Sequence, residues 1–297
     1  MAFPTSFVPF STRFAYFCAH IKRKKKNNMI VPIDTTKWYE RLAAAFVLYT
    51  HSPFSLFYKP EYKILRKAIE FWPLTGWGTG GVAAAIIFFG SQYVPSAIAV
   101  GIAIVVRLLL TKGMHEDGLR RFADAFVRGK NPRTVIERMQ TKSTSICGTV
   151  GLIIYFALLV SSLAAMPPSI AALALLAADP YSKMISSQMV LMLPYAWADK
   201  EGDNGYGYEK FGTVAGIILF LQGIVPLAVM LYMTRARWDL LVFVPCLTMY
   251  FLYLLMWNRL KGYNGCCLSA VALLTELAFL ITAATMFVTS PLSFFGL

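Results

Sequence analysis

The stretch CGTVGLIIYFALLVSSLAAM occupies residues 147–166 and contains no charged side chain. A helix needs about 20 predominantly apolar residues to cross the hydrocarbon core of a bilayer. This stretch therefore predicts a membrane-spanning helix. It also sets the fold class, because a chain built around such segments is an integral membrane protein.

Six further apolar segments lie at about residues 76–91, 95–111, 169–197, 211–233, 239–257 and 268–288, of which the first two are shorter than this length. With the first stretch they predict an all-α polytopic integral membrane protein with about seven transmembrane helices. The composition agrees, because 57% of the 297 residues are hydrophobic and 14% are charged. Soluble proteins have about 25% charged residues, so a water-soluble enzyme is disfavoured.

Two segments before the first span are too short or too charged to cross the bilayer. Residues Trp38–Thr50 predict a helix that lies in the interface or re-enters the membrane. In Tyr58–Glu70, basic residues alternate with apolar ones, which predicts a basic amphipathic helix on the membrane surface. These two segments are the expected interfacial helices.

The net charge of +13 would suggest a nucleic-acid partner in a soluble protein. Here residues 1–73 hold 12 Lys/Arg and 4 Asp/Glu, and residues 112–142 hold 8 and 4. Such clustering is typical of membrane proteins, so the expected partner is the lipid bilayer and not nucleic acid. An even number of spans separates the two basic parts. The positive-inside rule then places both in the cytoplasm, with the loops 198–210 and 258–267.

Residues 1–37 are interpreted as a basic N-terminal extension to a single membrane domain over 38–297. Either residues 1–28 precede a native start at Met29, or Lys22–Lys26 is a juxtamembrane cluster attracted to anionic lipid. Neither interpretation gives the extension a catalytic role. The spacing of the five cysteines fits no metal site or disulfide framework, which predicts reduced thiols.

The strongest chemical signal is HEDGLRRFADAF at residues 115–126, just after the segment 95–111. On a helix, Asp117, Arg121 and Asp124 are spaced i, i+4 and i+7 and share one face. Two carboxylates on such a face are able to hold Mg²⁺, which proteins bind through one or two carboxylates plus substrate phosphates. The alternative is an exposed interfacial helix in which Arg121 pairs with both aspartates.

Asp179, Lys183 and Glu276 fall inside apolar segments. Asp179 and Lys183 are four residues apart, a spacing at which they neutralise each other on a helix. Glu276 has no partner nearby in the sequence. An intramembrane acid indicates a functional site by default, and a buried structural hydrogen bond is the alternative.

The stretch from His115 to Ala125 resembles the HxDGLADxxDG hallmark of the cobalamin synthase family, the adenosylcobinamide-GDP ribazoletransferases. Further segments are similar to that family, in the same order along the chain. These are Phe71-Trp-Pro-Leu-Thr-Gly76, Arg138-Met139 to Gly148, Leu193-Pro-Tyr-Ala196, Lys261-Gly-Tyr-Asn-Gly265 and Glu276. The resemblance extends over about residues 71–276.

This resemblance implies a bacterial inner-membrane transferase with Mg²⁺ as cofactor and a cytoplasmic active side. It would join adenosylcobinamide-GDP to α-ribazole, or to its 5′-phosphate, and release GMP. A homo-oligomer stays open. The catalytic residues implied are His115, Asp117 and Asp124, of which the two aspartates are also the metal ligands. Substrate binding is assigned to Lys112, Arg120, Arg128, Lys130, Lys142, Lys183 and Glu276.

The sequence departs from the family pattern at polar positions. Arg121 stands where the pattern has an aspartate, and Cys266 replaces the aspartate that follows Gly265; the others are Ala125, Gln140-Thr-Lys-Ser143 and Trp197. Two alternatives therefore stay open. One is a catalytically degenerate homologue that binds a corrinoid or a lipid without turnover, and the other is a membrane transporter or scaffold. A CDP-alcohol phosphotransferase is disfavoured, since its DGxxAR spacing is missing.

Overall fold

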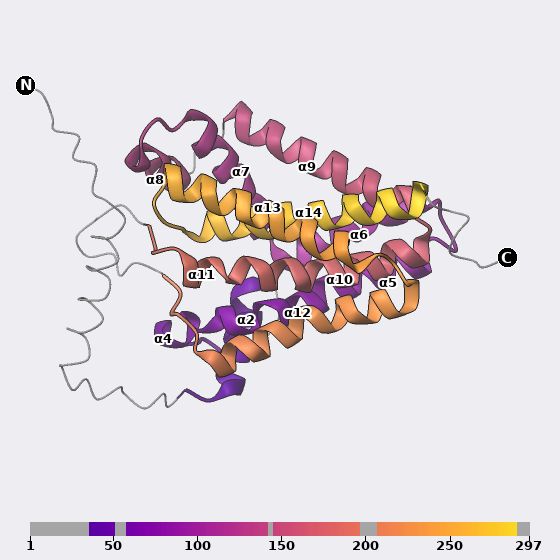
Figure 1. Ribbon diagram of the computed structural model, residues 1–297, viewed down its shortest axis with the longest axis horizontal. Helices are drawn as coiled ribbons and strands as arrows, with labels where there is room; N and C mark the ends of the chain where they lie inside the picture. The colour runs from indigo at the N-terminus through magenta and orange to yellow at the C-terminus, as the bar shows by residue number, and fades with distance from the viewer. Residues whose placement is uncertain (1–35, 51–57, 142–144, 197–206, 290–297) are drawn as a thin grey trace, which may run out of the picture. The chain divides into compact units, whose positions relative to one another are not determined.

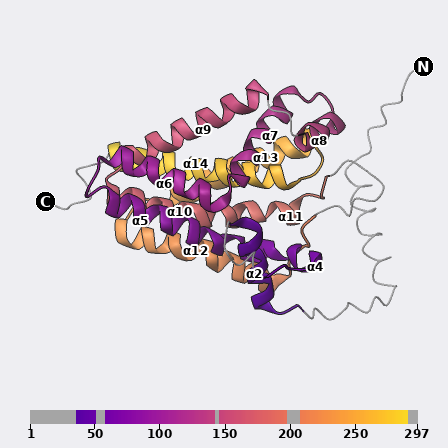
Figure 2. The same ribbon diagram turned by 180° about the vertical axis from the view of Figure 1, so that it is seen from behind.

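The computed structural model is a bundle of helices (Figure 1; Figure 2), and it describes residues 36–50, 58–141, 145–196 and 207–289. The chain divides between Thr36 and Lys37, and every element named below belongs to Lys37–Leu297. The predicted extension over residues 1–37 therefore lies outside the described residues, except for these two positions.

The segment before the first span differs from its prediction. Helix α2 (Trp38–Tyr49) is followed by a single turn, α4 (Tyr62–Leu65), and by the 3-10 helix η1 (Ala68–Phe71). The continuous amphipathic helix predicted for 58–70 is therefore wrong. The physical reason for the difference is that the side chains of Lys67 and Glu70 are buried within the fold, whereas a helix on the membrane surface would keep both exposed.

Helices α5 (Trp72–Gly90) and α10 (Pro168–Ser187) form the closest helix pair in the bundle. A Cβ atom added at Gly76 would lie 3.0 Å from the backbone nitrogen of Pro180, and one at Gly80 would lie 3.1 Å from Cβ of Asp179. Small residues let two backbones approach in this way. The glycines of the first span therefore serve close helix packing.

Replacing Gly76 with alanine is expected to destabilise the protein by about 1–3 kcal/mol, because the added methyl group meets backbone atoms of α10 that cannot move aside. The midpoint of thermal unfolding of the purified protein in detergent measures this. Gly101→Ala on α6 (Ser96–Thr111) is the matched control, since nothing lies within 4 Å of its added Cβ. Equal midpoints for the two variants would contradict the packing role.

A sharp bend joins α6 to α7 (Met114–Arg128). Lys112 and Gly113 both adopt left-handed backbone angles, with φ of 54° and 62°, and the two helices meet at 90°. Glycine takes this conformation without strain. The bend turns the HEDGL stretch across the end of the bundle, and we treat α7 as lying outside the spanning helices.

The remaining helices complete the bundle around α14 (Gly265–Thr289), which is buried over most of its length. They are α8 (Pro132–Gln140), α9 (Ile146–Ala165), α11 (Met189–Met192), α12 (Thr213–Thr234) and α13 (Trp238–Arg259). Helices α9, α12 and α13 leave large apolar side chains exposed, among them Ile153, Phe220 and Phe251. Exposed apolar faces of this extent are typical of lipid contact.

The prediction of an all-α polytopic membrane protein is confirmed, and the number of spans is corrected. Within the described residues five helices are long and apolar enough to cross a membrane, or six if the bent pair α6 and α7 counts as one span. The predicted number was about seven. The difference arises because α6 alone is too short and because α10 carries Asp179, Lys183 and several serines.

The polar connections gather at one end of the bundle. Helices α4, α7, α8 and α11 lie at the same end in both views, and the short links α5–α6, α9–α10 and α12–α13 lie at the other (Figure 1; Figure 2). This arrangement agrees with the expected placement of the loops 112–142 and 258–267 on one side of the membrane. The loop 198–210 is described only from Gly207 onward.

Candidate active site

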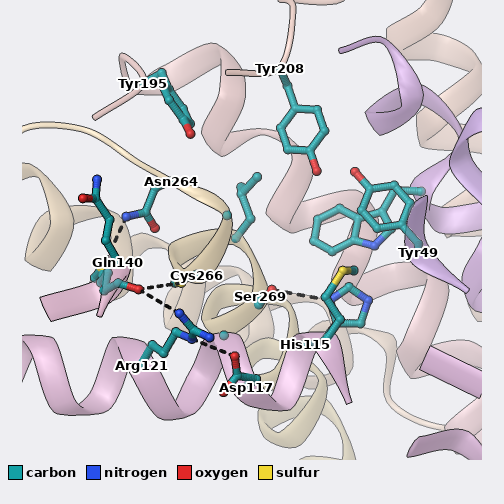
Figure 3. A pocket seen from close by; sticks show the side chains of 16 residues that line it. Tyr49, His115, Asp117, Arg121, Gln140, Tyr195, Tyr208, Asn264, Cys266 and Ser269 are labelled. Atoms are coloured by element: carbon teal, nitrogen blue, oxygen red, sulfur yellow. Dashed lines mark hydrogen bonds and ion pairs between the residues drawn. The ribbon is translucent and has the colours of Figure 1, made fainter. Parts of the chain in front are cut away.

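A pocket of about 600 Å³ opens at the polar end of the bundle (Figure 3). Helix α7 and the first turns of α14 form one part of it, and aromatic side chains from α2, α5 and two connecting segments form another. Its lining includes Tyr49, Trp72, His115, Asp117, Arg121, Gln140, Tyr195, Tyr208, Asn264 and Ser269. Residues that are more than 200 positions apart in the chain therefore share one cavity.

One side of the pocket is aromatic. The rings of Tyr49 and Trp72 are stacked with their centroids 5.2 Å apart, and Trp72 lies 5.6 Å from the ring of His115. Tyr195 and Tyr208 lie opposite Asp117 and Arg121 in Figure 3. Stacked rings of this kind provide flat apolar faces for a planar ligand.

Backbone pairing holds Tyr195 in place. The amide of Ala196 donates to the carbonyl of Tyr263 at 2.8 Å, and the amide of Tyr263 donates to the carbonyl of Pro194 at 2.9 Å. A Cβ atom on Gly262 would lie 2.6 Å from that carbonyl oxygen of Pro194, so the pairing requires glycine there. Two connecting segments are thus joined at the rim of the pocket.

The other side of the pocket is polar and carries the charged side chains of Asp117 and Arg121, and Arg120 contacts Asp117 from outside the lining. Oδ1 of Asp117 accepts hydrogen bonds from Arg120 at 2.6 and 3.0 Å, and Oδ2 accepts one from Arg121 at 2.7 Å. Partial burial raises the pKa of Asp117, but the two guanidinium groups outweigh it and the pKa lies below its ordinary value. Asp117 is therefore ionised and paired on both oxygens.

His115 lies in the first turn of α7 and is 4% exposed. Its Nδ1 is 3.5 Å from Oγ of Ser269, and its buried Nε2 has no hydrogen-bond partner among the described residues. Burial, followed by the positive charge of Lys183, lowers the pKa of His115 to about 3. The imidazole is therefore neutral at neutral pH.

Asp124 does not join Asp117 at the pocket. It is 7% exposed, its Oδ1 accepts a hydrogen bond from Ser145 at the start of α9, and Arg128 lies 3.8 Å away. Of the two ion pairs expected for Arg121, the one with Asp117 is present, and Asp124 has these other partners instead. The predicted helix spacing is correct, but the carboxylate of Asp124 accepts its hydrogen bond from Ser145 at the start of α9.

Of the basic residues predicted to bind substrate, Lys112, Arg120, Arg128 and Lys130 are absent from the lining of the pocket. Lys112 and Lys130 are exposed, and Arg120 and Arg128 face the two aspartates of α7. Lys142 lies outside the described residues. The binding roles of these residues stay predictions.

Lys183 and Glu276 lie in the interior of the bundle, in a cluster of charged groups. Arg107 of α6 donates to both oxygens of Glu276, at 2.6 and 2.7 Å, and lies 3.5 Å from Asp179. Lys183 pairs with Asp179 at 2.7 Å, as its spacing predicted. Thr79 of α5 donates to Asp179 at 2.7 Å. The cluster ties together α5, α6, α10 and α14.

The sequence interpretation missed most of the pocket as a set of site residues. Trp72, Gln140, Tyr195 and Asn264 each lie within a segment that resembles the cobalamin synthase family. The sequence signal available was the position of these residues in family-like segments, because segments that keep one order along the chain tend to build one site. Tyr49 and Tyr208 lie outside those segments, and nothing in the sequence pointed to them.

The donor set does not fit a protein-held Mg²⁺ ion. Mg²⁺ needs several oxygen ligands in near-octahedral geometry. Over the described ranges, no group of three or more His, Cys, Asp or Glu side chains converges. Asp117 is the one carboxylate among the described lining residues, and both of its oxygens already accept from guanidinium groups. The Mg²⁺ implied by the resemblance stays a prediction.

The fold and the site define a class: a polytopic helical membrane protein with an aromatic and cationic pocket at one end of its bundle. The sequence profile that describes the family Cobalamin-5-phosphate synthase matches residues 41–284. The chain belongs to this family. The matched range begins in α2 and ends in α14, so it includes both the pocket and the buried charged cluster.

Individual relatives are similar in sequence to this chain over most of their length. An adenosylcobinamide-GDP ribazoletransferase of Leptospira interrogans is 24% identical over 247 residues, which cover 81% of this chain and 93% of the relative. An enzyme of the same name from Clostridium botulinum is 26% identical over 234 residues, covering 78% and 92%. No solved structure matches this chain.

Proposed function

We propose that this protein joins adenosylcobinamide-GDP to α-ribazole, or to its 5′-phosphate, and releases GMP. The observation that carries the proposal is the convergence at one pocket of His115 and Asp117 with residues from four other family-like segments. Membership of the cobalamin-5-phosphate synthase family and the names of the relatives also support it. The corrinoid nucleotide and the ribazole are then the substrates.

The two sides of the pocket suit the two chemical parts of such substrates. The stacked rings of Tyr49 and Trp72 provide a face for the planar base of α-ribazole. Arg121, on the other side, would hold the diphosphate, since guanidinium groups form charge-assisted hydrogen bonds to phosphate oxygens. The base and the reacting phosphate would thus be held in one cavity, which positions them for reaction.

In this reaction a hydroxyl oxygen of α-ribazole attacks the phosphorus atom that carries cobinamide. A new P–O bond forms, the bond to the bridging oxygen breaks, and GMP leaves with that oxygen. The hydroxyl proton passes to Nε2 of His115, which is buried without a protein partner in the described part of the chain. A bound phosphate anion raises the pKa of a neighbouring imidazole, so the base becomes stronger when the substrate is present.

The proposed location is the bacterial cytoplasmic membrane, with the pocket open to the cytoplasm. Charge supports this orientation, because α7 and α8 carry most of the basic loop 112–142 and lie at the end where the pocket opens. A homo-oligomer stays a prediction.

The proposal is tested with the purified full-length protein in detergent or nanodiscs. Given adenosylcobinamide-GDP and α-ribazole, it should release GMP and form a cobalamin in equal amounts, both measured by chromatography. Arg133→Ala is a suitable reference variant, since Arg133 is exposed on α8 and pairs only with Glu137 at 3.0 Å among the described residues. Absence of both products at high enzyme concentration, with Mg²⁺ supplied, would reject the catalytic function.

A second function, binding without turnover, is favoured by one observation. Asp117 is neutralised by Arg120 and Arg121, so a carboxylate that the resemblance assigns to catalysis is already paired. A degenerate homologue would bind the corrinoid nucleotide and form no cobalamin. Equilibrium binding of adenosylcobinamide-GDP, measured beside the GMP assay, separates this outcome from the transferase.

A further inference from the structure

We infer that the polar side of the pocket is an anion site in which the guanidinium of Arg121 and nearby neutral donors bind phosphate oxygens directly, without a divalent cation held by the protein. The inference deepens the proposed function and takes its substrate class, a phosphate ester, from it. The site itself is argued from charge and hydrogen bonding, which do not depend on turnover.

The charge of the lining favours an anion. Asp117 and Arg121 line the pocket, and Arg120 donates to Asp117 from the adjoining position on α7. Two guanidinium groups on one carboxylate leave a net positive charge at this wall. A divalent cation would meet that positive charge, whereas an oxyanion would be attracted to it.

Hydrogen bonds fix the orientation of the Arg121 guanidinium. Its Nε donates to Asp117 at 2.7 Å and its Nη1 donates to the carbonyl of Met139 at 3.4 Å. Nη2 has no hydrogen-bond partner within the described ranges, and the side chain is 25% exposed. Because Nε and Nη1 are hydrogen-bonded, the plane of the Arg121 guanidinium is fixed. The N–H groups of Nη2 are then oriented to donate hydrogen bonds to an acceptor atom of a ligand.

Unpartnered buried atoms show which kind of ligand the pocket lacks. Gln140, Trp72 and His115 line the pocket, and Nε2 of Gln140, the indole Nε1 of Trp72 and Nε2 of His115 are buried without a partner among the described residues. A buried polar atom without a hydrogen bond costs about 1–3 kcal/mol. The indole N–H and the amide NH₂ are donors only. They would be satisfied by acceptor oxygens, which a phosphate supplies and a metal ion does not.

The experiment measures binding of inorganic pyrophosphate to the full-length protein in detergent, by calorimetry, with EDTA or with Mg²⁺. The expected result is binding in EDTA. Arg121→Ala should weaken it by about 10- to 150-fold, the effect of one charge-assisted hydrogen bond. Arg121→Asp should abolish binding in EDTA and regain it with Mg²⁺. Arg133→Ala, with the same loss of charge on an exposed site, should bind as the native protein does.

Gln140→Leu is the second variant, because it leaves the Asp117 pairs intact and should still weaken pyrophosphate binding several-fold. Binding by the native protein only when Mg²⁺ is present would overturn the inference. So would unchanged binding in Arg121→Ala. EDTA-resistant binding that depends on Arg121, without any GMP release from the substrates, would uphold this site and reject the proposed transferase.

Discussion

Replacing Glu276 with alanine is expected to lower the free energy of unfolding by about 3–5 kcal/mol, the usual effect of removing one partner of a buried ion pair. Glu276 is 1% exposed and accepts two hydrogen bonds from Arg107, which is itself buried. Without the carboxylate, the guanidinium stays in the interior of the bundle with Asp179 at 3.5 Å as its remaining acid. Chemical unfolding in mixed micelles measures the change.

The double variant Arg107→Met with Glu276→Met is the control for this prediction. Replacing a buried ion pair with apolar residues of similar volume is often neutral, so the double variant should be much more stable than Glu276→Ala. If Glu276→Ala remains within about 1 kcal/mol of the native protein, Arg107 must find other partners and the cluster does not hold the bundle together.

His115→Gln is expected to lower kcat of the proposed transferase by about 10²- to 10⁴-fold, the typical contribution of a general base. Glutamine keeps a polar side chain beside the stacked rings of Trp72 and Tyr49 but cannot take up a proton at neutral pH. Substrate binding should change little, since the group proposed to hold phosphate is Arg121. The measurement is the rate of GMP release at saturating substrate, with the thermal unfolding midpoint as a check on folding.

Ser269→Ala is the matched control for His115. Its Oγ lies 3.5 Å from Nδ1 of His115 and orients the ring without touching the reacting atoms, so a smaller loss of rate is expected. A His115→Gln variant that keeps the native rate would show that another group, or solvent, accepts the proton. The stacked rings would then hold His115 for a structural reason.

The fold class followed from the sequence because transmembrane helices are defined by local composition. Residues 147–166 predicted a span that the structure places at Ile146–Ala165. Interfacial segments are harder to predict, since the alternation of basic and apolar residues in 58–70 predicts a continuous surface helix that the structure does not contain. In the structure, Lys67 and Glu70 are buried and Arg66 donates to the carbonyl of Gly207, 141 residues away. Local periodicity carries no information about such contacts.

The candidate site was predictable only in part. Helix spacing brought Asp117 and Arg121 together, since both lie on α7. It failed for Asp124, whose partner Ser145 comes from the next long helix. Of the predicted site residues that the structure describes, only His115 and Asp117 line the pocket, although Trp72, Gln140 and Asn264 lie in segments that resemble the family. Tyr49 and Tyr208 join it through tertiary packing alone, which is why no sequence signal preceded them.

The pairing of Arg107 with Glu276 also constrains how the protein is made. The two residues are 169 positions apart, and chains are synthesised at about 5–20 residues per second. Arg107 therefore leaves the ribosome roughly ten to thirty seconds before the acid that neutralises it. Asp179 arrives earlier but is shared with Lys183. An arginine without its own acid is costly in a bilayer, so α6 is expected to stay in the insertion machinery, or near water, until α14 arrives. Chains that end before α14 would be left with an unstable span and become substrates for membrane proteases.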